Sequence, residues 1–396
     1  MHLAESDRIL RLAGRGDGVG ESGRFYPLTA PGDLVASDGS VEPGAHRRVP
    51  PCRHFPECGG CQLQHVDDEA YAGFLRDRIA SALAAQGVAA PDILTAHISP
   101  PNSRRRASLR AERGGALGFN AEASHRVIDM RECHILRPEL FALVQPLRAL
   151  LRSLKLPAAA AGVRLTLTDQ GVDLLLEKVE AEGLAAAEAL GAFARENALA
   201  RLALDDGYGA QTHWEPDPVT VTLGGVPVPL PHGAFLQATA EGEAALVEAV
   251  RSAVGEARVV ADLFAGLGTF ALALDGRILA AEAARDSALA LKTAAARARR
   301  PVFVDHRDLY RRPLDRAELG RFQAVVLDPP RAGAKEQTAL LARSEVPRIA
   351  FVSCNPSTFA RDAAALTEGG YRFDWIRPVG QFRWSTHVEL VGAFSR

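Results

Sequence analysis

Residues 236–396 alternate between short apolar runs and alanine-rich stretches, and this alternation constrains the fold more than any other feature. A helix is predicted at 241–254, and the apolar runs lie at 257–265, 277–283, 301–306, 323–330 and 348–356, with helical stretches between several of them. Continuous apolar strands separated by helices are typical of a parallel sheet that is buried on both faces. We therefore predict a doubly wound α/β domain, whose ligands bind beyond the carboxyl ends of its strands.

The ends of the first three runs carry residues suited to an adenosine ligand. The first is followed by a glycine-rich turn with Gly266 and Thr269, where the backbone can approach a ligand closely. It lacks the third glycine of a dinucleotide fingerprint and the Gly-Lys-Ser of a phosphate loop. Glu282 can accept both ribose hydroxyls and Asp308 an adenine amino group, although either carboxylate can instead be ordinary surface. An adenosine site without a phosphate clamp indicates S-adenosylmethionine.

The fourth and fifth runs end in "DPPRAG" and "SCNPSTFARD", which place Asp328 and Cys354 at the same rim. Arg331 stands where some amino methyltransferases carry an aromatic residue, which argues against amino methylation. Cys354 is either buried packing or a nucleophile. Because C5 of uracil is a poor nucleophile, its methylation needs a thiolate added at C6 and then a base that removes the C5 proton. We expect residues 385–391 to be the last strand, with His387 and Glu389 facing one side of it as candidate bases.

Three of the five cysteines lie within ten residues, and a fourth, Cys133, lies far along the chain. The spacing of Cys52, Cys58 and Cys61 is C-x5-C-x2-C, and we expect the intervening glycines to let the loop curl toward one centre. Closely spaced cysteines in a reducing compartment indicate a metal or catalysis. Four thiolates suit either zinc or a 4Fe–4S cluster, and the pattern alone leaves both open.

Length and composition set the domain organisation. The 396 residues indicate two or three domains, for which we predict boundaries at 1–49, 50–235 and 236–396. The first is a small β-barrel or a plain structural extension, and the second is a mixed α and β region with two strands around the turn at 169–171.

The net charge of −2 gives no overall nucleic-acid footprint, and we interpret the arginines at 104–113 as solvated surface. The start of the sequence lacks the apolar run of a signal peptide, and no run of about 18 apolar residues occurs, so we expect a cytoplasmic protein without membrane association. No motif implies a protein partner, and a monomer is expected.

Taken in order, these motifs resemble the bacterial RNA uracil-C5 methyltransferases, specifically the iron–sulfur branch that acts on 23S ribosomal RNA. The segments "CGGCQLQH", "FLQAT", "DPPRAG", "SCNPSTFARD" and "HVE" match that family over nearly the full length. The resemblance implies a Rossmann-like C-terminal domain, a central α+β iron–sulfur domain and a shortened RNA-binding TRAM segment. It departs from the family at Thr269, where asparagine is usual, and in "FRWSTHVE" before Glu389.

The resemblance assigns roles to individual residues. It implies Cys354 as the nucleophile and Glu389 as the base, with a 4Fe–4S cluster on Cys52, Cys58, Cys61 and Cys133. The methyl donor is expected to contact Gln237, Phe264, Gly266, Thr269, Glu282, Asp308 and Asp328. The predicted activity is S-adenosylmethionine-dependent methylation of C5 of a uridine in 23S ribosomal RNA. The alternatives are the same chemistry on transfer RNA, or an inactive, metal-stabilised RNA-binding protein.

Overall fold

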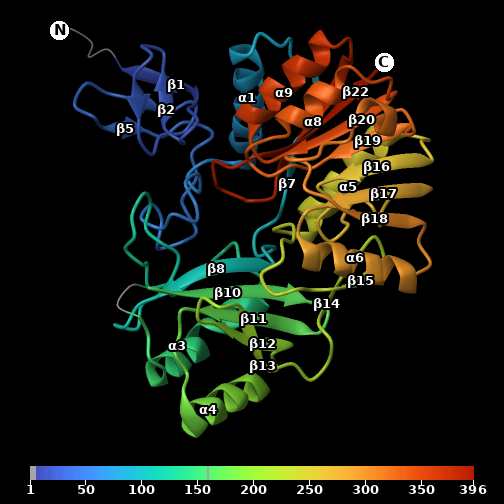
Figure 1. The fold of residues 1–396 in the computed structure, drawn as a ribbon. Coiled ribbons are helices and arrows are strands. Elements are labelled where there is room, and N and C mark those ends of the chain that lie inside the picture. Colours follow the sequence, from blue (N-terminus) through green and yellow to red (C-terminus); the bar gives the residue numbers. More distant parts are fainter. Residues whose placement is uncertain (1–5, 158–159) are drawn as a thin grey trace, which may run out of the picture.

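The computed structural model describes residues 6–157 and 160–396, which form a small N-terminal sheet, a central sheet and a large C-terminal sheet (Figure 1). The N-terminal sheet has the order β3-β2-β1-β4-β5, with β1 (Asp7–Leu12), β2 (Gly18–Gly20), β3 (Phe25–Tyr26), β4 (Leu34–Val35) and β5 (Val41–Glu42). Gly18 and Gly20 are the two ends of strand β2. A side chain at Gly18 would collide with Ile9 and Thr29, and one at Gly20 with Asp7, so close packing requires glycine at both positions.

The central sheet has the order β13-β12-β11-β10-β8-β9. Its strands are β8 (Arg106–Ala111), β9 (Leu117–Gly118), β10 (Ala161–Thr168), β11 (Gly171–Glu177), β12 (Arg201–Asp205) and β13 (Ala210–Trp214). The predicted pair of strands around 169–171 is confirmed as β10 and β11. Helices α2 (Pro138–Ala142), α3 (Val144–Ser153) and α4 (Gly183–Glu196) contribute apolar side chains to one core with this sheet. Helices α3 and α4 lie on one side of the sheet and leave its other face free of helices (Figure 1).

The C-terminal sheet has the order β18-β17-β16-β19-β20-β22-β21-β6, with β7 also paired to β21. Its main strands are β16 (Val259–Leu263), β17 (Arg277–Glu282), β18 (Val302–His306), β19 (Ala324–Leu327), β20 (Arg348–Ser353), β21 (Arg372–Gly380) and β22 (Glu389–Ser395). The first five run parallel, as predicted, and β22 is inserted antiparallel between β20 and β21. The doubly wound α/β expectation is confirmed, with a mixed rather than a fully parallel sheet.

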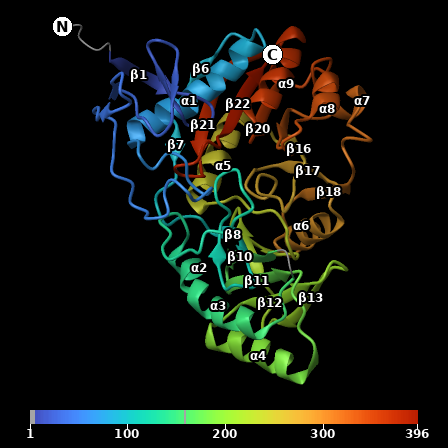
Figure 2. The same ribbon diagram turned by 90° about the vertical axis from the view of Figure 1, so that its left-hand side faces the viewer.

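Helices cover both faces of this sheet, as Figures 1 and 2 show. The helices are α5 (Ala240–Val254), α6 (Arg285–Arg297), α7 (Arg316–Leu319), α8 (Lys335–Leu341) and α9 (Pro356–Glu368). One core includes residues of α5 and α6 with the hairpin β14 (Thr220–Leu223) and β15 (Val226–Pro229), and the other includes residues of α8 and α9. Within the described part of the chain, no helix combines the length and apolar character needed to span a membrane.

Residues 68–98 join the C-terminal sheet rather than the central one. Helix α1 (Asp68–Ala85) begins after Asp67, whose carboxylate accepts the N–H of Ala70. It packs in the same core as α9, while β6 (Asp92–Ile93) and β7 (His97–Ile98) pair in parallel with β21. The predicted boundary at 235 stays a prediction, but this early segment is structurally part of the C-terminal sheet.

Candidate functional site

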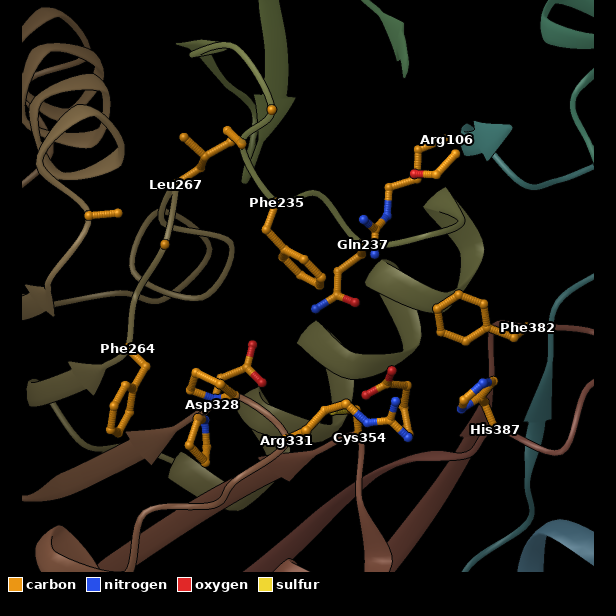
Figure 3. Close-up of a pocket in the computed structure, with 18 of the residues that line it drawn as sticks. Arg106, Phe235, Gln237, Phe264, Leu267, Asp328, Arg331, Cys354, Phe382 and His387 are labelled. Carbon is orange, nitrogen blue, oxygen red and sulfur yellow. The ribbon is translucent and has the colours of Figure 1, made fainter. Parts of the chain in front are cut away.

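A cleft of about 1320 Å³ lies between the carboxyl ends of the C-terminal strands and the free face of the central sheet. Figure 3 shows Asp328, Arg331 and Cys354 on one side of it, with Phe235, Gln237 and Arg106 facing them. All nine predicted donor and catalytic residues line this one cleft: Gln237, Phe264, Gly266, Thr269, Glu282, Asp308, Asp328, Cys354 and Glu389. The topology therefore brings together residues that span more than a third of the chain.

The loop after β16 pre-orients Glu282. Phe264 adopts a φ of 65°, which is unusual for a residue with a side chain and marks a constrained site. The turn that follows lets the N–H of Gly266 donate to Oε2 of Glu282 at 2.8 Å, while the N–H of Ala284 donates to Oε1 at 2.6 Å. The carboxylate is thus fixed by two backbone bonds at the end of β17, with lone pairs left for a ligand.

An aromatic pair lies beside Asp308. Its Oδ1 accepts the N–H of Tyr310 at 2.9 Å, and the ring of Tyr310 lies 5.5 Å from that of Phe264. Tyr310 lines the cleft, but no pattern in the sequence singled it out. Phe264, Tyr310 and Asp308 together form a partly apolar recess with two tilted rings and an acceptor beside them, which suits an adenine ring.

Cys354 and Glu389 are brought together by strand pairing. Cys354 follows the last residue of β20, and Glu389 is the first residue of β22. The antiparallel register pairs Ser353 with Leu390, so the next position along this ladder opposes Cys354 to Glu389. This adjacency depends on a contact between residues 35 positions apart in the chain, and only the insertion of β22 beside β20 creates it.

The two groups have strongly altered acidities. Burial raises the pKa of Glu389 to about 7, against the opposing effects of a hydrogen bond from Gln381 and of the Arg106 and Arg331 cations. Burial, reinforced by the nearby Glu389 and Asp328 carboxyls, raises the pKa of the Cys354 thiol to about 11. Burial also raises the pKa of Asp328 well above its usual range. Three acidic groups that share one buried pocket are a common arrangement for proton transfer.

His387 does not lie on the last strand, which corrects the sequence prediction. The strand begins at Glu389, so His387 and Glu389 do not face one side of a strand. The N–H of His387 instead donates to Oγ of Ser385, and its ring lies 5.8 Å from that of Phe382, in the loop that leads into β22. His387 still lines the cleft, where burial and nearby arginines lower its pKa. It is therefore a neutral neighbour of the pocket.

Sequence comparisons place the chain in a family. An uncharacterized RNA methyltransferase of Zymomonas mobilis is 54% identical over 394 residues, covering 98% of this chain and 99% of the relative. The 23S rRNA (uracil(1939)-C(5))-methyltransferase RlmD of Chromohalobacter salexigens is 34% identical over 376 residues, covering 88% of this chain and 77% of the relative. The family described as tRNA (Uracil-5-)-methyltransferase matches residues 302–395. This chain belongs to the RNA uracil-C5 methyltransferases.

The methyltransferase has the fold of that family over its whole length. The crystal structure of Pyrococcus abyssi tRNA (uracil-54, C5)-methyltransferase in complex with S-adenosyl-L-homocysteine matches it with a TM-score of 0.76. The match covers 98% of this chain and 99% of that chain at 21% sequence identity. Together with the sequence comparisons, this makes the protein an S-adenosylmethionine-dependent RNA (uracil-5-)-methyltransferase.

The sequence suggested that the arginines at 104–113 are solvated surface. In the structure of this methyltransferase, the arginines at 104–106 are not. Arg105 pairs with Glu243 at 2.5 Å, and the guanidinium of Arg104 lies 5.3 Å from the ring centroid of Phe382. The guanidinium of Arg106 lies 4.5 Å from the ring centroid of Phe235, and burial lowers its pKa to about 10. Arg104 and Arg106 therefore line the cleft as desolvated cations. The local charge pattern could not predict these contacts, because Phe235 and Phe382 are far from the arginines in the sequence.

The four predicted cysteine ligands of the methyltransferase line one small enclosed cavity of about 20 Å³. Cys52, Cys58, Cys61 and Cys133 share it with apolar side chains that include Phe55, Phe119, Ile128 and Met130. Over residues 6–157 and 160–396, no three or more Cys, His, Asp or Glu side chains are close enough to hold one metal ion. Zinc requires ligand sulfurs about 3.8 Å apart, given a Zn–S bond of about 2.3 Å. The four thiols, as the structure places them, therefore do not have the spacing of a single zinc site.

The cysteine loop is tied to the catalytic loop. The N–H groups of Gln62 and Leu63 both donate to the carbonyl of Trp384 at 2.8 Å, five residues before Glu389. Gly59 has no positive φ, contrary to the expectation of a glycine-dependent curl, and its N–H instead donates to the carbonyl of Asn120 at 2.9 Å. A side chain at Gly59 would press against that carbonyl. Glycine is needed here for close approach rather than for backbone freedom.

Proposed function

We propose that this enzyme methylates C5 of one uridine in 23S ribosomal RNA, with S-adenosylmethionine as the donor. The observation that carries the reaction is the convergence of Cys354, Glu389 and Asp328 with the Glu282 loop in one cleft. The ribosomal substrate is supported by the 34% identical Chromohalobacter salexigens relative, whose name specifies 23S rRNA. The alternative is transfer RNA, which the description of the matching family favours.

The first steps form and methylate a covalent adduct. The Cys354 thiolate adds to C6 of uracil, which breaks the C5–C6 double bond and leaves an enolate. C5 then attacks the methyl carbon of the donor, the C–S⁺ bond breaks, and S-adenosylhomocysteine leaves as a neutral thioether. The Arg331 cation favours the thiolate by lowering the pKa of Cys354, against the larger effect of burial.

The last steps restore the aromatic ring. Glu389 removes the proton from C5, the electron pair reforms the C5–C6 double bond, and the C6–S bond breaks to regenerate the thiolate. A carboxylate with a pKa of about 7 suits this role, because it is basic enough to accept the proton and is half ionised at neutral pH. Asp328, which burial favours in the protonated form, can donate a hydrogen bond to a uracil carbonyl.

The donor-binding roles follow from the geometry of the strand ends. We assign the ribose to Glu282, whose carboxylate is held by two backbone N–H groups. The adenine is assigned to the recess formed by Phe264, Tyr310 and Asp308. Gln237, Gly266, Thr269 and Asp328 complete the lining toward the methyl group.

The four cysteines are proposed to hold a 4Fe–4S cluster with a structural role. When bound, the cluster would cross-link the loop of residues 52–61 to Cys133 by thiolate–iron bonds. Because Gln62 and Leu63 hold the Trp384 carbonyl, fixing the cysteine loop also fixes the chain that leads into Glu389. The methylation steps above transfer no net electrons, so they need no redox centre.

The RNA is proposed to bind between the N-terminal sheet and the free face of the central sheet. Arg106, Ser108 and Arg110 alternate along β8 and all line the cleft, so one face of this strand presents two cations. Phe235, which is 60% exposed beside Arg106, offers a surface on which a base can stack. The shortened TRAM-like segment at 1–49 is assigned to the flanking RNA.

The test is mass mapping of 5-methyluridine in ribosomal and transfer RNA from cells with and without this gene. Loss of the modification at one 23S uridine is the expected result. Loss only in transfer RNA would overturn the ribosomal assignment and keep the chemistry. Complementation with the wild-type gene should restore 5-methyluridine. Complementation with Cys354→Ala should not restore it in either RNA.

A further inference from the structure

Gln381 is a buried amide that the proposed chemistry does not use. It follows β21 directly, is 2% exposed, and is absent from the lining of the cleft. Its side chain nevertheless contacts two residues that do line the cleft, Gln237 and Glu389. Such a residue acts on the reaction through its neighbours and not by touching the substrates.

The orientation of the Gln381 amide is fixed by a backbone donor. The N–H of Ala238 can only donate, and it donates to Oε1 of Gln381 at 2.9 Å. Nε2 of Gln381 must therefore point the other way, where it donates to Oε1 of Gln237 at 2.8 Å. This chain of bonds removes the usual ambiguity between oxygen and nitrogen in both amides.

The consequence is a fixed polarity at Gln237. Since Oε1 of Gln237 accepts from Gln381, its NH₂ group is directed away from Gln381 and into the cleft. Figure 3 shows the Gln237 side chain extending between Phe235 and Cys354. We propose that Gln381 is a positioning residue, which fixes the Gln237 amide so that an N–H donor faces an oxygen acceptor of the bound substrates.

The acceptor is a carboxylate or a carbonyl oxygen. The methionine carboxylate of the donor and the O4 carbonyl of the target uracil both fit the proposed contents of the cleft, and the inference rests on that proposed function. A donor at this position would also disfavour cytosine, because cytosine carries an amino group in place of O4. Two measurements separate the sources: binding of S-adenosylhomocysteine without RNA, and covalent adduct formation with RNA.

The decisive variant is Gln381→Glu. A carboxylate can accept from Ala238 and also from the Gln237 NH₂ group, so Gln237 should turn by about 180° and present its oxygen to the cleft. We expect a roughly 10- to 100-fold loss in the affected measurement, because the N–H donor is replaced by a repelling acceptor. Gln381→Met removes the orienting bonds without reversing them, and should cost about 3- to 10-fold.

A matched control is available in Gln337, a second buried amide that is 1% exposed and bonds to the backbone of Leu314. Gln337→Met should lower the melting temperature much as Gln381→Met does, while S-adenosylhomocysteine affinity and adduct formation stay within about twofold of wild type. In a Gln237→Leu background, Gln381→Glu should cause no further loss of S-adenosylhomocysteine affinity or adduct formation, because those effects pass through Gln237, whereas the contact of Gln381 with Glu389 bears on adduct release.

Weaker S-adenosylhomocysteine binding by Gln381→Glu, measured by calorimetry, would support the inference and identify the donor carboxylate as the acceptor. Unchanged binding with slower adduct formation would support it and identify the uracil carbonyl. Equal losses in Gln381→Glu and Gln381→Met, or full additivity with Gln237→Leu, would overturn it. The calorimetric measurement uses no RNA, so an error in the ribosomal assignment would leave it unaffected.

Discussion

Release of the methylated RNA from Cys354 should depend on pH through one group, Glu389. Burial raises the pKa of this carboxyl to about 7, and only the ionised form can accept the C5 proton. The ionised fraction is then about one-tenth at pH 6, one-half at pH 7 and nine-tenths at pH 8. Release should accordingly accelerate about tenfold from pH 6 to pH 8, and less than twofold from pH 7 to pH 8.

A pH-jump experiment isolates this step. The covalent adduct is formed with radiolabelled donor at pH 6 and moved to a series of pH values, and its decay is followed on denaturing gels. Adduct formation should behave differently, because the pKa of Cys354 is raised to about 11 and the thiolate fraction rises throughout this range. Its rate should show no plateau near pH 7.

Two variants decide whether Glu389 is the group observed. Glu389→Gln should accumulate the adduct and slow its release by about 10²- to 10⁴-fold at every pH. Glu248→Gln alters a carboxylate on α5 that is 70% exposed and pairs with Arg377, so it should leave the profile unchanged. A release rate with a midpoint near pH 4.5, or one that keeps its pH dependence in Glu389→Gln, would refute the reasoning.

Three further predictions concern stability and the cysteines. Asp262 is fully buried and burial raises its pKa to about 7, so the folded state binds the proton more tightly and stability falls as pH rises from about 4 to 7. Asp262→Asn should therefore be more stable than wild type by up to about 4 kcal/mol at pH 8 and equal to it near pH 4, in denaturant titrations. A pH-independent difference would contradict this. Arg201 makes two bonds of 2.8 and 2.9 Å to the buried Asp173, so Arg201→Met should cost about 3–5 kcal/mol in thermal melts. The double variant with Asp173→Leu should recover most of that loss, and no recovery would mean that the unpaired carboxylate is not the cause. Cys133→Ser should lower the iron and acid-labile sulfide of anaerobically purified protein from about four of each per chain. Wild-type protein without either would exclude the cluster.

The sequence was informative where function depends on short segments. The strand ends of the α/β domain carry Glu282, Asp328 and Cys354 at predictable places, because parallel strands deliver their carboxyl ends to one edge. The apolar runs and helix 241–254 were located within a few residues, because a local hydrophobic pattern is enough to place such elements. The assignment of Cys354 and Glu389 to one pocket needed chemistry as well as pattern, since a thiolate addition at C6 requires a base nearby.

What sequence could not reveal depends on contacts between distant segments. Arg106 reads as part of a charged run, and only the meeting of β8 with Phe235 makes it a desolvated cation in the cleft. Gln381 carries no motif at all, and its importance appears only when its bonds to Ala238 and Gln237 are traced. His387 was misplaced because the last strand starts at Glu389, four residues after the predicted start at 385.

The pairing of β6 and β7 with β21 has a consequence for the order in which the chain matures during translation. Helix α1 leaves the ribosome early, yet much of the apolar surface that it covers belongs to α9 and β21, which are synthesised near the end. The apolar side of α1, with Tyr71, Phe74 and Leu75, therefore stays uncovered until α9 and β21 have been synthesised. A fragment that starts at residue 236 would in turn leave the β21 edge unpaired and prone to self-association. Synthesis of this catalytic sheet on its own would thus need the segment 68–98 supplied as a separate, complementing peptide.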